Sequence, residues 1–339
     1  MKKSVRQADI AEALGISIVS VSKALAGKSG VGPELREQIL KKAEELGYTS
    51  ISDLAQKPNK SLSFALIFHE KYVELNTSFY SKLTQQITVC AMNTGGYILS
   101  EVISREMERT YMLPRLVSEN RADGVIILGH FTPSYISFLA ENMKLPFILL
   151  DNYGMDYHTD SIISDSYYGA YTATNYLFSM GHRKIAYVGT VLQTGSITDR
   201  YLGYRRSMIE HGQEMPEDYV MDDRGPAGVV YPADMLQLPK DMPTAFFCNC
   251  DITASILIRR LRSEGLRVPD DISVVGFDNF VYPGACDIEI TSYEVDIDRM
   301  AKCAVNLLTK KIRGAHYRRG LYIMEGHMVL KESVRRLEA

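Results

Sequence analysis

Strand-like and helix-like segments alternate along most of this 339-residue chain, and this alternation is the feature that most limits its fold. Short apolar runs stand at 64–68, 124–128, 146–150, 184–189, 244–248 and 272–277. Amphipathic segments with helical spacing lie among them, at 80–93, 169–181, 199–211, 251–264 and 298–313. Continuous apolar strands separated by helices are typical of parallel sheets covered on both faces. Because roughly 275 residues follow this pattern, we expect two doubly wound halves rather than one sheet.

The composition is that of an ordinary globular protein, with 46% hydrophobic and 23% charged residues. No apolar run reaches the roughly 18 residues of a membrane span, and the polar segment after Lys3 is unlike a signal peptide. We therefore expect a cytoplasmic protein that does not contact a membrane. Five cysteines without the spacing of a disulfide framework or a metal site are expected to be reduced thiols, and we expect no metal and no cofactor.

The first 48 residues show a different pattern, that of three short helices. Apolar residues up to Leu14 form one helical stripe, Gly15 supplies a turn, and Ser17 suits the N-cap of a second helix. The inward residues expected in the second helix are Val21, Ala24 and Leu25. A third helix is expected from Pro33 to Gly47, with a buried face of Leu35, Ile39, Ala43 and Leu46. Three such helices predict a helix-turn-helix, whose second helix enters the DNA major groove; a generic helical hairpin is the alternative.

Two residues of the second helix have no inward face to occupy in this pattern. Ile18 and Val19 are therefore expected to be exposed. The charge is also uneven, since residues 1–60 contain ten Lys/Arg and seven Asp/Glu, a net charge of +3, which leaves −6 for residues 61–339. This asymmetry is mild, and it indicates nucleic acid only in combination with the helix-turn-helix pattern.

Polar residues that follow the predicted strands are the candidates for a ligand site, because ligands of such folds bind beyond the carboxyl ends of the strands. These residues are His69, His130, Asp151, Asn152, Asp251, Asp278 and Asn279. Asp251 and Asp165 directly precede helical segments, so we interpret both as helix N-caps. No helical pattern begins directly after Asp151 or Asp278, which favours a ligand role for these two carboxylates.

A guanidinium and an aromatic pair complete the set of candidates. Arg200 begins a helical segment and can donate two parallel hydrogen bonds to vicinal hydroxyls or to a carboxylate. Acceptors such as Asp278 together with donors such as Arg200 suit a polyol. Phe79 and Tyr80 form either an apolar wall of the site or part of the hydrophobic core.

These residues bear on three classes of function. An enzyme is unsupported, because the sequence has no nucleophile elbow, zinc-protease motif, phosphate-binding loop or dinucleotide fingerprint. A solute-binding protein is expected to carry a signal peptide and would not need residues 1–48. A DNA-binding regulator accounts for both parts of the chain, and a cytoplasmic sugar sensor or solute-binding protein with a weakened DNA-binding role is the alternative.

Six segments resemble the lactose-repressor (LacI/GalR) family of bacterial transcription regulators over essentially the whole chain. They are "DIAEALGISIVSVSKALAG", "VGPELREQILKKAEELGY", "MGHRKIAYVG", "DRYLGYRRSM", "SEGLRVPDDISVVGFDN" and "ITSYEVDIDRMAKCAVNLL", in family order and with family spacing. The resemblance implies a homodimer that binds a pseudo-palindromic operator and represses a carbohydrate-utilisation operon. It also implies a periplasmic-binding-protein-like core of two doubly wound α/β subdomains around a small sugar-like effector.

The resemblance also implies boundaries and site residues. The helix-turn-helix spans 1–48, a hinge linker spans 49–62, and the core spans 63–339. The first subdomain of the core comprises about 63–160 and 291–321, and the second about 161–290 and 322–339. The DNA-binding positions are Arg6, Gln7, Ser17, Ile18, Val19, Ser22, Lys23 and Leu54. The effector-binding positions are His69, Phe79, Asp151, Arg200, Arg224, Cys250 and Asp278. At a base edge, the aliphatic Ile18 and Val19 would contact thymine methyl groups.

Two positions depart from the family pattern. Pro58 blocks an extended hinge helix, so that either Leu54 inserts into the minor groove or the hinge does not insert at all. Arg224 stands where many sugar-binding relatives carry an aromatic residue. Its charge either selects an acidic or phosphorylated sugar or pairs with Asp222 or Asp223 at the surface.

Overall fold

The structure is a computed structural model that describes residues 6–25, 30–46, 61–73, 79–154, 159–280 and 284–338. The chain divides between Ser61 and Leu62 into two compact units, here called the head (Met1–Ser61) and the body (Leu62–Ala339). Leu54 and Pro58, on which the hinge prediction depends, lie outside the described residues. No helix within the described ranges is long and apolar enough to cross a membrane.

The head contains the three predicted helices, α1 (Gln7–Leu14), α2 (Ile18–Leu25) and α3 (Pro33–Leu46). Gly15 ends α1 at a φ of +65°, in the left-handed region that glycine enters without a steric penalty. The Ser17 hydroxyl accepts the Ser20 backbone N–H at 3.1 Å, as expected of an N-cap. The buried residues of the three helices meet in one cluster formed by Ile10, Ala11, Val21, Ala24, Ile39 and Ala43.

One residue expected in that cluster lies outside it. Leu46 is 38% exposed because it is the last residue of α3 and lies beyond the six buried residues. Leu25 and Leu35 are partly buried at the edge of the cluster.

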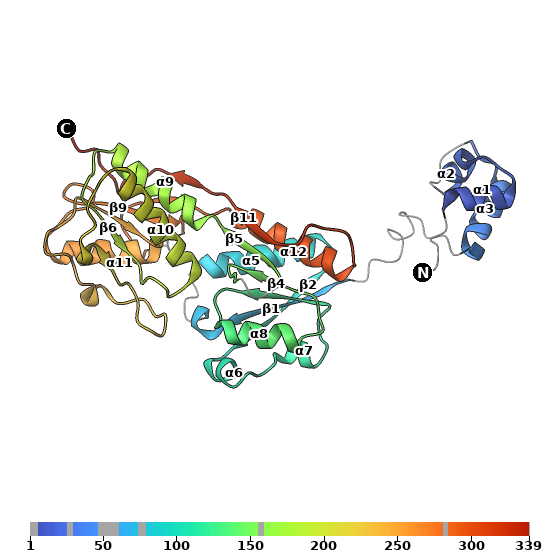
Figure 1. The fold of residues 1–339 in the computed structure, drawn as a ribbon, viewed down its shortest axis with the longest axis horizontal. Helices are drawn as coiled ribbons and strands as arrows, with labels where there is room; N and C mark the ends of the chain where they lie inside the picture. Colours follow the sequence, from blue (N-terminus) through green and yellow to red (C-terminus); the bar gives the residue numbers. More distant parts are fainter. Residues whose placement is uncertain are drawn as a thin grey trace. The chain divides into compact units, whose positions relative to one another are not determined.

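The body contains two six-stranded sheets (Figure 1). In the first sheet the order is β11-β5-β4-β3-β1-β2, and all neighbouring strands are parallel. The strands are β1 (Ser63–His69), β2 (Tyr97–Ile103), β3 (Gly124–Leu128), β4 (Phe147–Leu150), β5 (Asp160–Ser164) and β11 (Leu321–Met324). The side chains of β1, β3 and β4 are nearly all buried, which explains why these strands are continuous apolar runs.

The second sheet has the order β12-β10-β9-β8-β6-β7 and is parallel except for β12, which runs antiparallel to β10. Its strands are β6 (Ile185–Val188), β7 (Val220–Met221), β8 (Ala245–Cys248), β9 (Ser273–Asp278), β10 (Thr291–Glu294) and β12 (His327–Val329). The predicted pair of doubly wound halves is therefore confirmed.

Helices cover both faces of each sheet. On the first sheet, α5 (Phe79–Asn93) and α12 (Ile297–Ile312) pack on one face, and α8 (Pro133–Asn142) packs on the other. On the second sheet, α9 (Ser166–Ser179) and α10 (Gly195–Glu210) pack on one face, and α11 (Asp251–Ser263) on the other. Short elements complete the body, namely α6 (Arg105–Arg109), α7 (Arg115–Ser118) and the 3-10 turns Glu70–Tyr72, Glu217–Tyr219 and Ala233–Met235.

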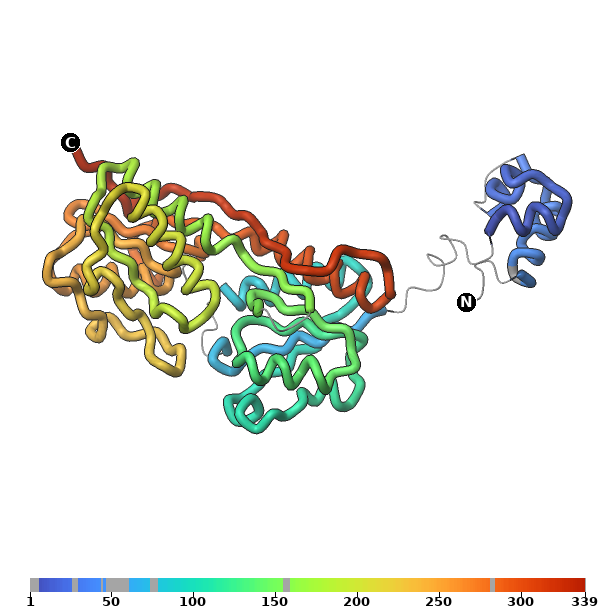
Figure 2. Tube along the Cα trace, viewed as in Figure 1, coloured from blue at the N-terminus to red at the C-terminus, as the bar shows by residue number. Residues whose placement is uncertain are grey.

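The chain passes between the two sheets three times, after β5, after β10 and after β11 (Figure 2). These passages differ slightly from the expected boundaries at 160, 290 and 321. β5 pairs within the first sheet up to Ser164, β10 pairs with β9 up to Glu294, and β11 pairs with β5 up to Met324. Strand pairing, which the family resemblance does not specify, therefore moves each boundary three to four residues along the chain.

The crossing of α9 and α10 depends on a glycine. A Cβ atom on Gly203 would overlap the Tyr167 carbonyl oxygen and would lie 2.9 Å from the Tyr171 nitrogen. Both neighbours are backbone atoms of α9, which cannot rotate away. The closeness of the two helices therefore requires a residue without a side chain at this position.

We predict that Gly203→Ala lowers the free energy of unfolding of the body by about 1–3 kcal/mol, the usual cost of overpacking. Arg205→Ala, at an exposed position of the same helix, is the matched control and should change stability by less than about 0.5 kcal/mol. Urea unfolding followed by circular dichroism measures both. Equal stability of the two variants would contradict the close crossing.

Candidate functional site

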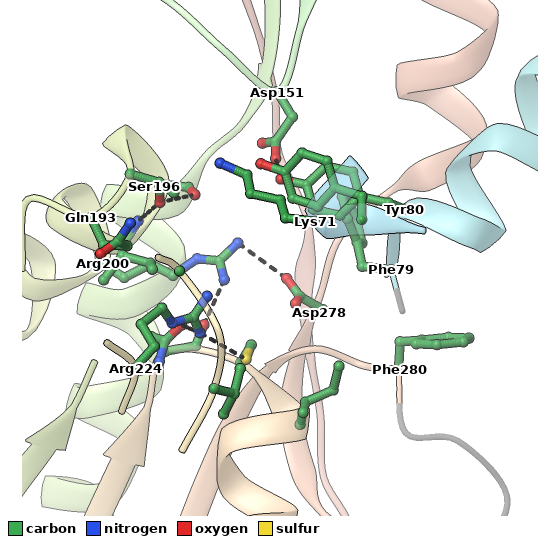
Figure 3. A pocket seen from close by; sticks show the side chains of 18 residues that line it. Lys71, Phe79, Tyr80, Asp151, Gln193, Ser196, Arg200, Arg224, Asp278 and Phe280 are labelled. Carbon is green, nitrogen blue, oxygen red and sulfur yellow. Dashed lines mark hydrogen bonds and ion pairs between the residues drawn. The ribbon is translucent and has the colours of Figure 1, made fainter. Parts of the chain in front are cut away.

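A pocket of about 860 Å³, including space open to solvent, lies between the two subdomains of the body (Figure 3). From the first subdomain it is lined by Lys71, Tyr72, Phe79, Tyr80 and Asp151. From the second it is lined by Gln193, Thr194, Ser196, Ile197, Arg200, Arg224, Gly228, Val230, Asn249, Cys250, Ile252, Asp278 and Phe280. Most of these residues follow the carboxyl end of a strand, as expected of a ligand site in parallel sheets.

The two carboxylates chosen from the sequence stand at strained turns. Asp151 directly follows β4 with a φ of +56°, and Asp278 ends β9 with a φ of +94°. Asn279 continues this turn at +50°. Residues other than glycine rarely adopt a positive φ, although Asp and Asn tolerate it better than most. Such strain concentrates at binding sites, so its occurrence at both carboxylates supports a ligand role.

Arg200 and Asp278 form an ion pair inside the pocket, with 3.1 Å between Nη2 and Oδ1. Arg200 is 6% exposed, donates to the Asn249 carbonyl oxygen at 2.5 Å and lies over the Phe277 ring at 3.8 Å. Burial raises the pKa of the Asp278 carboxyl, and the charge and hydrogen bond of Arg200 oppose this shift. Arg200 and Asp278 thus neutralise each other within the pocket.

Asp151 lies on the opposite wall and is bound by an aromatic hydroxyl. The Tyr80 hydroxyl donates to Asp151 Oδ2 at 2.6 Å, and the Tyr80 ring packs against Tyr72 with 4.1 Å between ring centroids. Burial raises the pKa of the Asp151 carboxyl to about 6, although the Tyr80 hydrogen bond and the Arg200 charge oppose this shift. Phe79 serves both roles considered for it, since it lines the pocket and belongs to the hydrophobic core.

Arg224 is bound by a carboxylate beneath the pocket surface. Its Nε and Nη2 atoms donate to Asp223 Oδ1 and Oδ2 at 3.0 and 2.6 Å, and Nη2 also donates to Asn249 Oδ1 at 3.1 Å. Asp223 is fully buried and also accepts from the Thr190 backbone N–H and the Thr253 hydroxyl. The sequence left two roles for Arg224, selection of an acidic ligand or pairing with Asp222 or Asp223 at the surface. In the structure Arg224 pairs with Asp223, and this pair is buried.

Burial and counter-charge act in opposite directions on Asp223. Burial alone would raise the pKa of its carboxyl, but the Arg224 charge and the hydrogen bonds from Arg224 and Thr253 lower it to about 2. The buried pair is therefore ionised at neutral pH.

His69 differs from the sequence-based prediction because it does not line the pocket. It is 4% exposed, its Nδ1 atom accepts the Lys71 backbone N–H at 3.1 Å, and Nε2 lies 3.2 Å from Glu108 Oε2. Both ring nitrogens are thus engaged within the first subdomain. His69 holds the backbone of the turn that carries Lys71.

Asp251 is a second departure, whereas Asp165 is as predicted. Asp165 accepts the Tyr168 backbone N–H at 3.0 Å and is the N-cap of α9. At α11, Cys250 takes the N-cap position, and the Asp251 carboxylate instead accepts from the Ser292 hydroxyl and the Phe280 backbone N–H. Asp251 thereby ties the start of α11 to the loop that follows Asp278.

Six of the seven predicted effector positions line the pocket, and His69 is the exception. The sequence reasoning missed Lys71, Tyr72, Gln193, Thr194, Ser196, Asn249 and Phe280. Lys71 and Tyr72 could have been found, because they follow the same strand end as His69. Within the part of the chain that the structure describes, no cluster of three or more His, Cys, Asp or Glu residues could hold a metal ion.

The predicted DNA-binding residues gather at α1 and α2 of the head. Ile18 and Val19 are 53% and 62% exposed, which confirms that they face away from the helix cluster. Ser22 and Lys23 lie one turn further along α2 and are also exposed. Arg6, Gln7 and Ser17 stand at the starts of α1 and α2, and none of them is buried. Two aliphatic side chains beside polar ones thus form an outward surface on α2.

We predict that Asp223→Asn lowers the free energy of unfolding by about 3–5 kcal/mol, because the half-buried Arg224 guanidinium loses its counter-charge. The double variant Asp223→Asn/Arg224→Met should be more stable than the single variant, and chemical unfolding at pH 7 compares them.

Because the folded-state pKa of Asp223 is lowered, its contribution to the free energy of unfolding is present above about pH 4 and is lost as the pH falls towards 2. Equal stability of the single and double variants would contradict a charge effect.

Comparisons with known proteins agree with this architecture. A family profile described as a periplasmic binding protein-like domain matches residues 174–334. An HTH-type transcriptional repressor PurR of Vibrio campbellii is 27% identical over 339 residues, covering 97% of this chain and 98% of that protein. Two solved structures share the fold along nearly the whole chain.

The transcriptional regulator CelR in complex with cellobiose has a TM-score of 0.69 and 22% identity, covering 97% of this chain and 99% of that one. The lac repressor dimer bound to operator and the anti-inducer ONPF has a TM-score of 0.66 and 20% identity, covering 98% and 100%.

These relatives span both units of the chain, so the likeness includes the helix-turn-helix head as well as the two-sheet body. The matched proteins are transcriptional regulators and not enzymes. Along nearly its whole length the chain is therefore similar to DNA-binding transcriptional regulators of the LacI/GalR type.

Proposed function

We propose that this protein is a cytoplasmic repressor of a carbohydrate-utilisation operon, and that a small hydroxyl-rich effector controls its binding to operator DNA. The observation that carries the proposal is the composition of the pocket, which combines Asp151 from one subdomain with Arg200 and Asp278 from the other. The exposed surface of α2 supports the DNA-binding part. The family and the relatives support a homodimer that binds a pseudo-palindromic operator.

The chemistry of the pocket supports a polyol. A sugar hydroxyl both donates and accepts hydrogen bonds, so it needs carboxylates and cations in the same site. Asp278 and Arg200 place an acceptor and a donor side by side in the pocket, and Asp151 has an oxygen that Tyr80 does not use. The aromatic side chains of Tyr72, Phe79 and Tyr80 offer an apolar surface for the carbon skeleton of the effector.

The position of the pocket supports control of DNA binding. A ligand shifts a conformational equilibrium only by its differential affinity for the two states. An effector that contacts both subdomains meets this condition, because their separation changes its contacts. Two hydrogen bonds already cross between the subdomains beside the pocket, from Tyr153 to Asp199 at 2.7 Å and from Arg105 to the Ala227 carbonyl at 3.5 Å. These contacts would help an effector to hold the subdomains together.

On α2, we propose that Ile18 and Val19 contact thymine methyl groups and that Ser22 and Lys23 reach polar base edges. Arg6, Gln7 and Ser17 are proposed to contact the phosphate backbone. Leu54 stays a candidate minor-groove wedge from the sequence alone. A sugar sensor or solute-binding protein with a weakened DNA-binding role is the alternative, and it requires no sequence preference of the head.

We predict that Lys23→Ala relaxes the preference for one base pair in each half-site, with a loss of about 1–3 kcal/mol if the lysine binds a guanine edge. Binding of the full chain to a site selected in vitro, measured across a salt series, tests this together with the expected steep loss of affinity at high salt. Lys42→Ala is the control, because Lys42 pairs with Glu45 within α3 at 2.6 Å. Equal affinity for all DNA sequences would favour the alternative function.

We predict that Asp278→Asn abolishes the effect of an effector on operator binding and leaves DNA affinity without effector unchanged. Asn is preferred to Ala because Arg200 keeps a polar neighbour in the buried pocket. The control is Asp222→Asn, an exposed carboxylate outside the pocket. Operator binding is measured with D-glucose, D-galactose, D-gluconate and D-galacturonate. A variant that responds as the unmodified protein does to any of these compounds would show that the effector binds elsewhere.

A further inference from the structure

Lys71 is a cation of the pocket that the protein itself does not neutralise. Its side chain extends into the pocket on the side where Ser196 lies (Figure 3). Among the described residues, no carboxylate lies within ion-pair distance of its ammonium group, which lies 5.1 Å from the centre of the Tyr72 ring. The backbone of Lys71 is held by His69, so the turn presents this side chain in a defined direction.

The other cations of the pocket are already compensated. Arg200 pairs with Asp278, and Arg224 pairs with the buried Asp223. Glu108 lies close enough to act on Lys71 electrostatically, but its carboxylate is hydrogen-bonded to the Thr132 backbone N–H and lies against His69. Lys71 is therefore the pocket cation without a carboxylate partner among the described residues, as Asp151 is the pocket carboxylate whose partner is a hydroxyl group. The Lys71 ammonium remains available to a negative group of a ligand. Burial lowers the pKa of Lys71 to about 8, Glu108 opposes this shift, and the charges of Arg105 and Arg224 add to it. The ammonium form therefore predominates at pH 7.

The wall opposite Lys71 is rich in hydrogen-bond donors. The start of the sixteen-residue helix α10 carries the hydroxyls of Thr194 and Ser196, which lie 3.1 Å apart. A smaller hollow continues from the pocket along this helix start and is lined by Asn152. Asn152 is 8% exposed, and its Nδ2 atom has no hydrogen-bond partner among the described residues. Helix N-termini favour negative groups, and the unused amide adds a further donor.

We infer that the effector is a polyhydroxy carboxylate, such as a sugar acid, whose carboxylate is bound by Lys71 beside the start of α10. This inference rests on the proposed function, because the hydroxyls of the same ligand would be bound by Arg200, Asp278 and Asp151. A single uncompensated lysine suits a monoanion. A phosphate carries about −1.5 to −2 charges at pH 7, and the two arginines that would share it are already paired. Lys71, rather than Arg224, is then the residue that selects an acidic ligand.

Isothermal titration calorimetry with matched ligands tests the inference. The acids are D-gluconate, D-glucuronate and D-galacturonate, and their neutral counterparts are D-sorbitol, D-glucose and D-galactose, in the same order. Two further ligands serve as controls: glucose 6-phosphate is a phosphorylated sugar, and adenine is a planar ligand without hydroxyls. The full-length protein should bind at least one acid tenfold or more tightly than its neutral counterpart. Lys71→Met should weaken that binding roughly 10- to 100-fold, and Lys71→Arg should retain most of it. Lys184→Met, at an exposed lysine that pairs with Asp241, should have no effect.

The inference is overturned if neutral ligands bind as tightly as acids, if none of the acids binds, if only the phosphate or adenine binds, or if Lys71→Met binds the acid normally. Failure of the proposed function looks different. If Asp278→Asn abolishes binding of a ligand and Lys71→Met does not change it, the pocket is correct and only the inferred carboxylate of the ligand is wrong. If neither variant changes the binding, the effector does not bind in the proposed pocket.

Discussion

The parallel direction of the strands is the constraint on which the rest of the body depends. Parallel strands end on the same edge of their sheet, so the residues that follow β1 and β4 come together, as do those that follow β6, β8 and β9. The three passages of the chain between the sheets make these two edges face a common pocket. Asp151 and Asn249 thus reach the pocket directly after a buried strand, whereas Arg200 and Phe79 reach it from the helix that follows the strand.

The charges of the pocket follow from its burial. An ionised side chain out of water requires a counter-charge or several hydrogen bonds. Asp223 receives both, and Arg200 receives Asp278, a backbone carbonyl and the face of Phe277. The pocket is therefore nearly neutral in spite of its many charged residues. In such a setting a lone cation like Lys71 stands out, because most of the charges around it are balanced.

The body combines tightly packed sheets with strained turns beside the pocket. The sheets are tightly held by buried helices, as the close crossing at Gly203 illustrates. Three of the non-glycine residues with a positive φ, Asp151, Asp278 and Asn279, stand at strand ends beside the pocket. The others in the described residues are Tyr111, Asn120 and Leu192. Among the described residues, hydrogen bonds between the subdomains beside the pocket run from Tyr153 to Asp199 and from Arg105 to Ala227. A ligand that adds contacts across this boundary would favour one arrangement of the two subdomains.

The sequence by itself determined the architecture. Six apolar runs predicted β1, β3, β4, β6, β8 and β9, because a strand that is buried on both faces needs apolar residues at nearly every position. Helical spacing of apolar residues predicted α5 and α9 to α12. It missed β2, β5, β7, β10, β11 and β12, and the helices α6 to α8. β2 is a half-exposed edge strand, and β11 is also largely exposed. β7 and β12 have only two and three residues, and β5 and β10 carry polar residues such as Asp160, Ser292 and Glu294. The exposure of Ile18 and Val19 also followed from periodicity alone.

Only the tertiary structure decided which charges meet. From the sequence, Arg224 had two equal partners in Asp222 and Asp223, and alternation along the chain could not show that Asp223 is the buried one. His69 and Lys71 stand two residues apart after the same strand, yet one is enclosed by Glu108 and the other enters the pocket. A local sequence pattern shows whether a residue is buried, because burial selects the type of each residue separately. Which charged residues form ion pairs depends on the distances between segments far apart in the chain, and only the folded structure sets those distances.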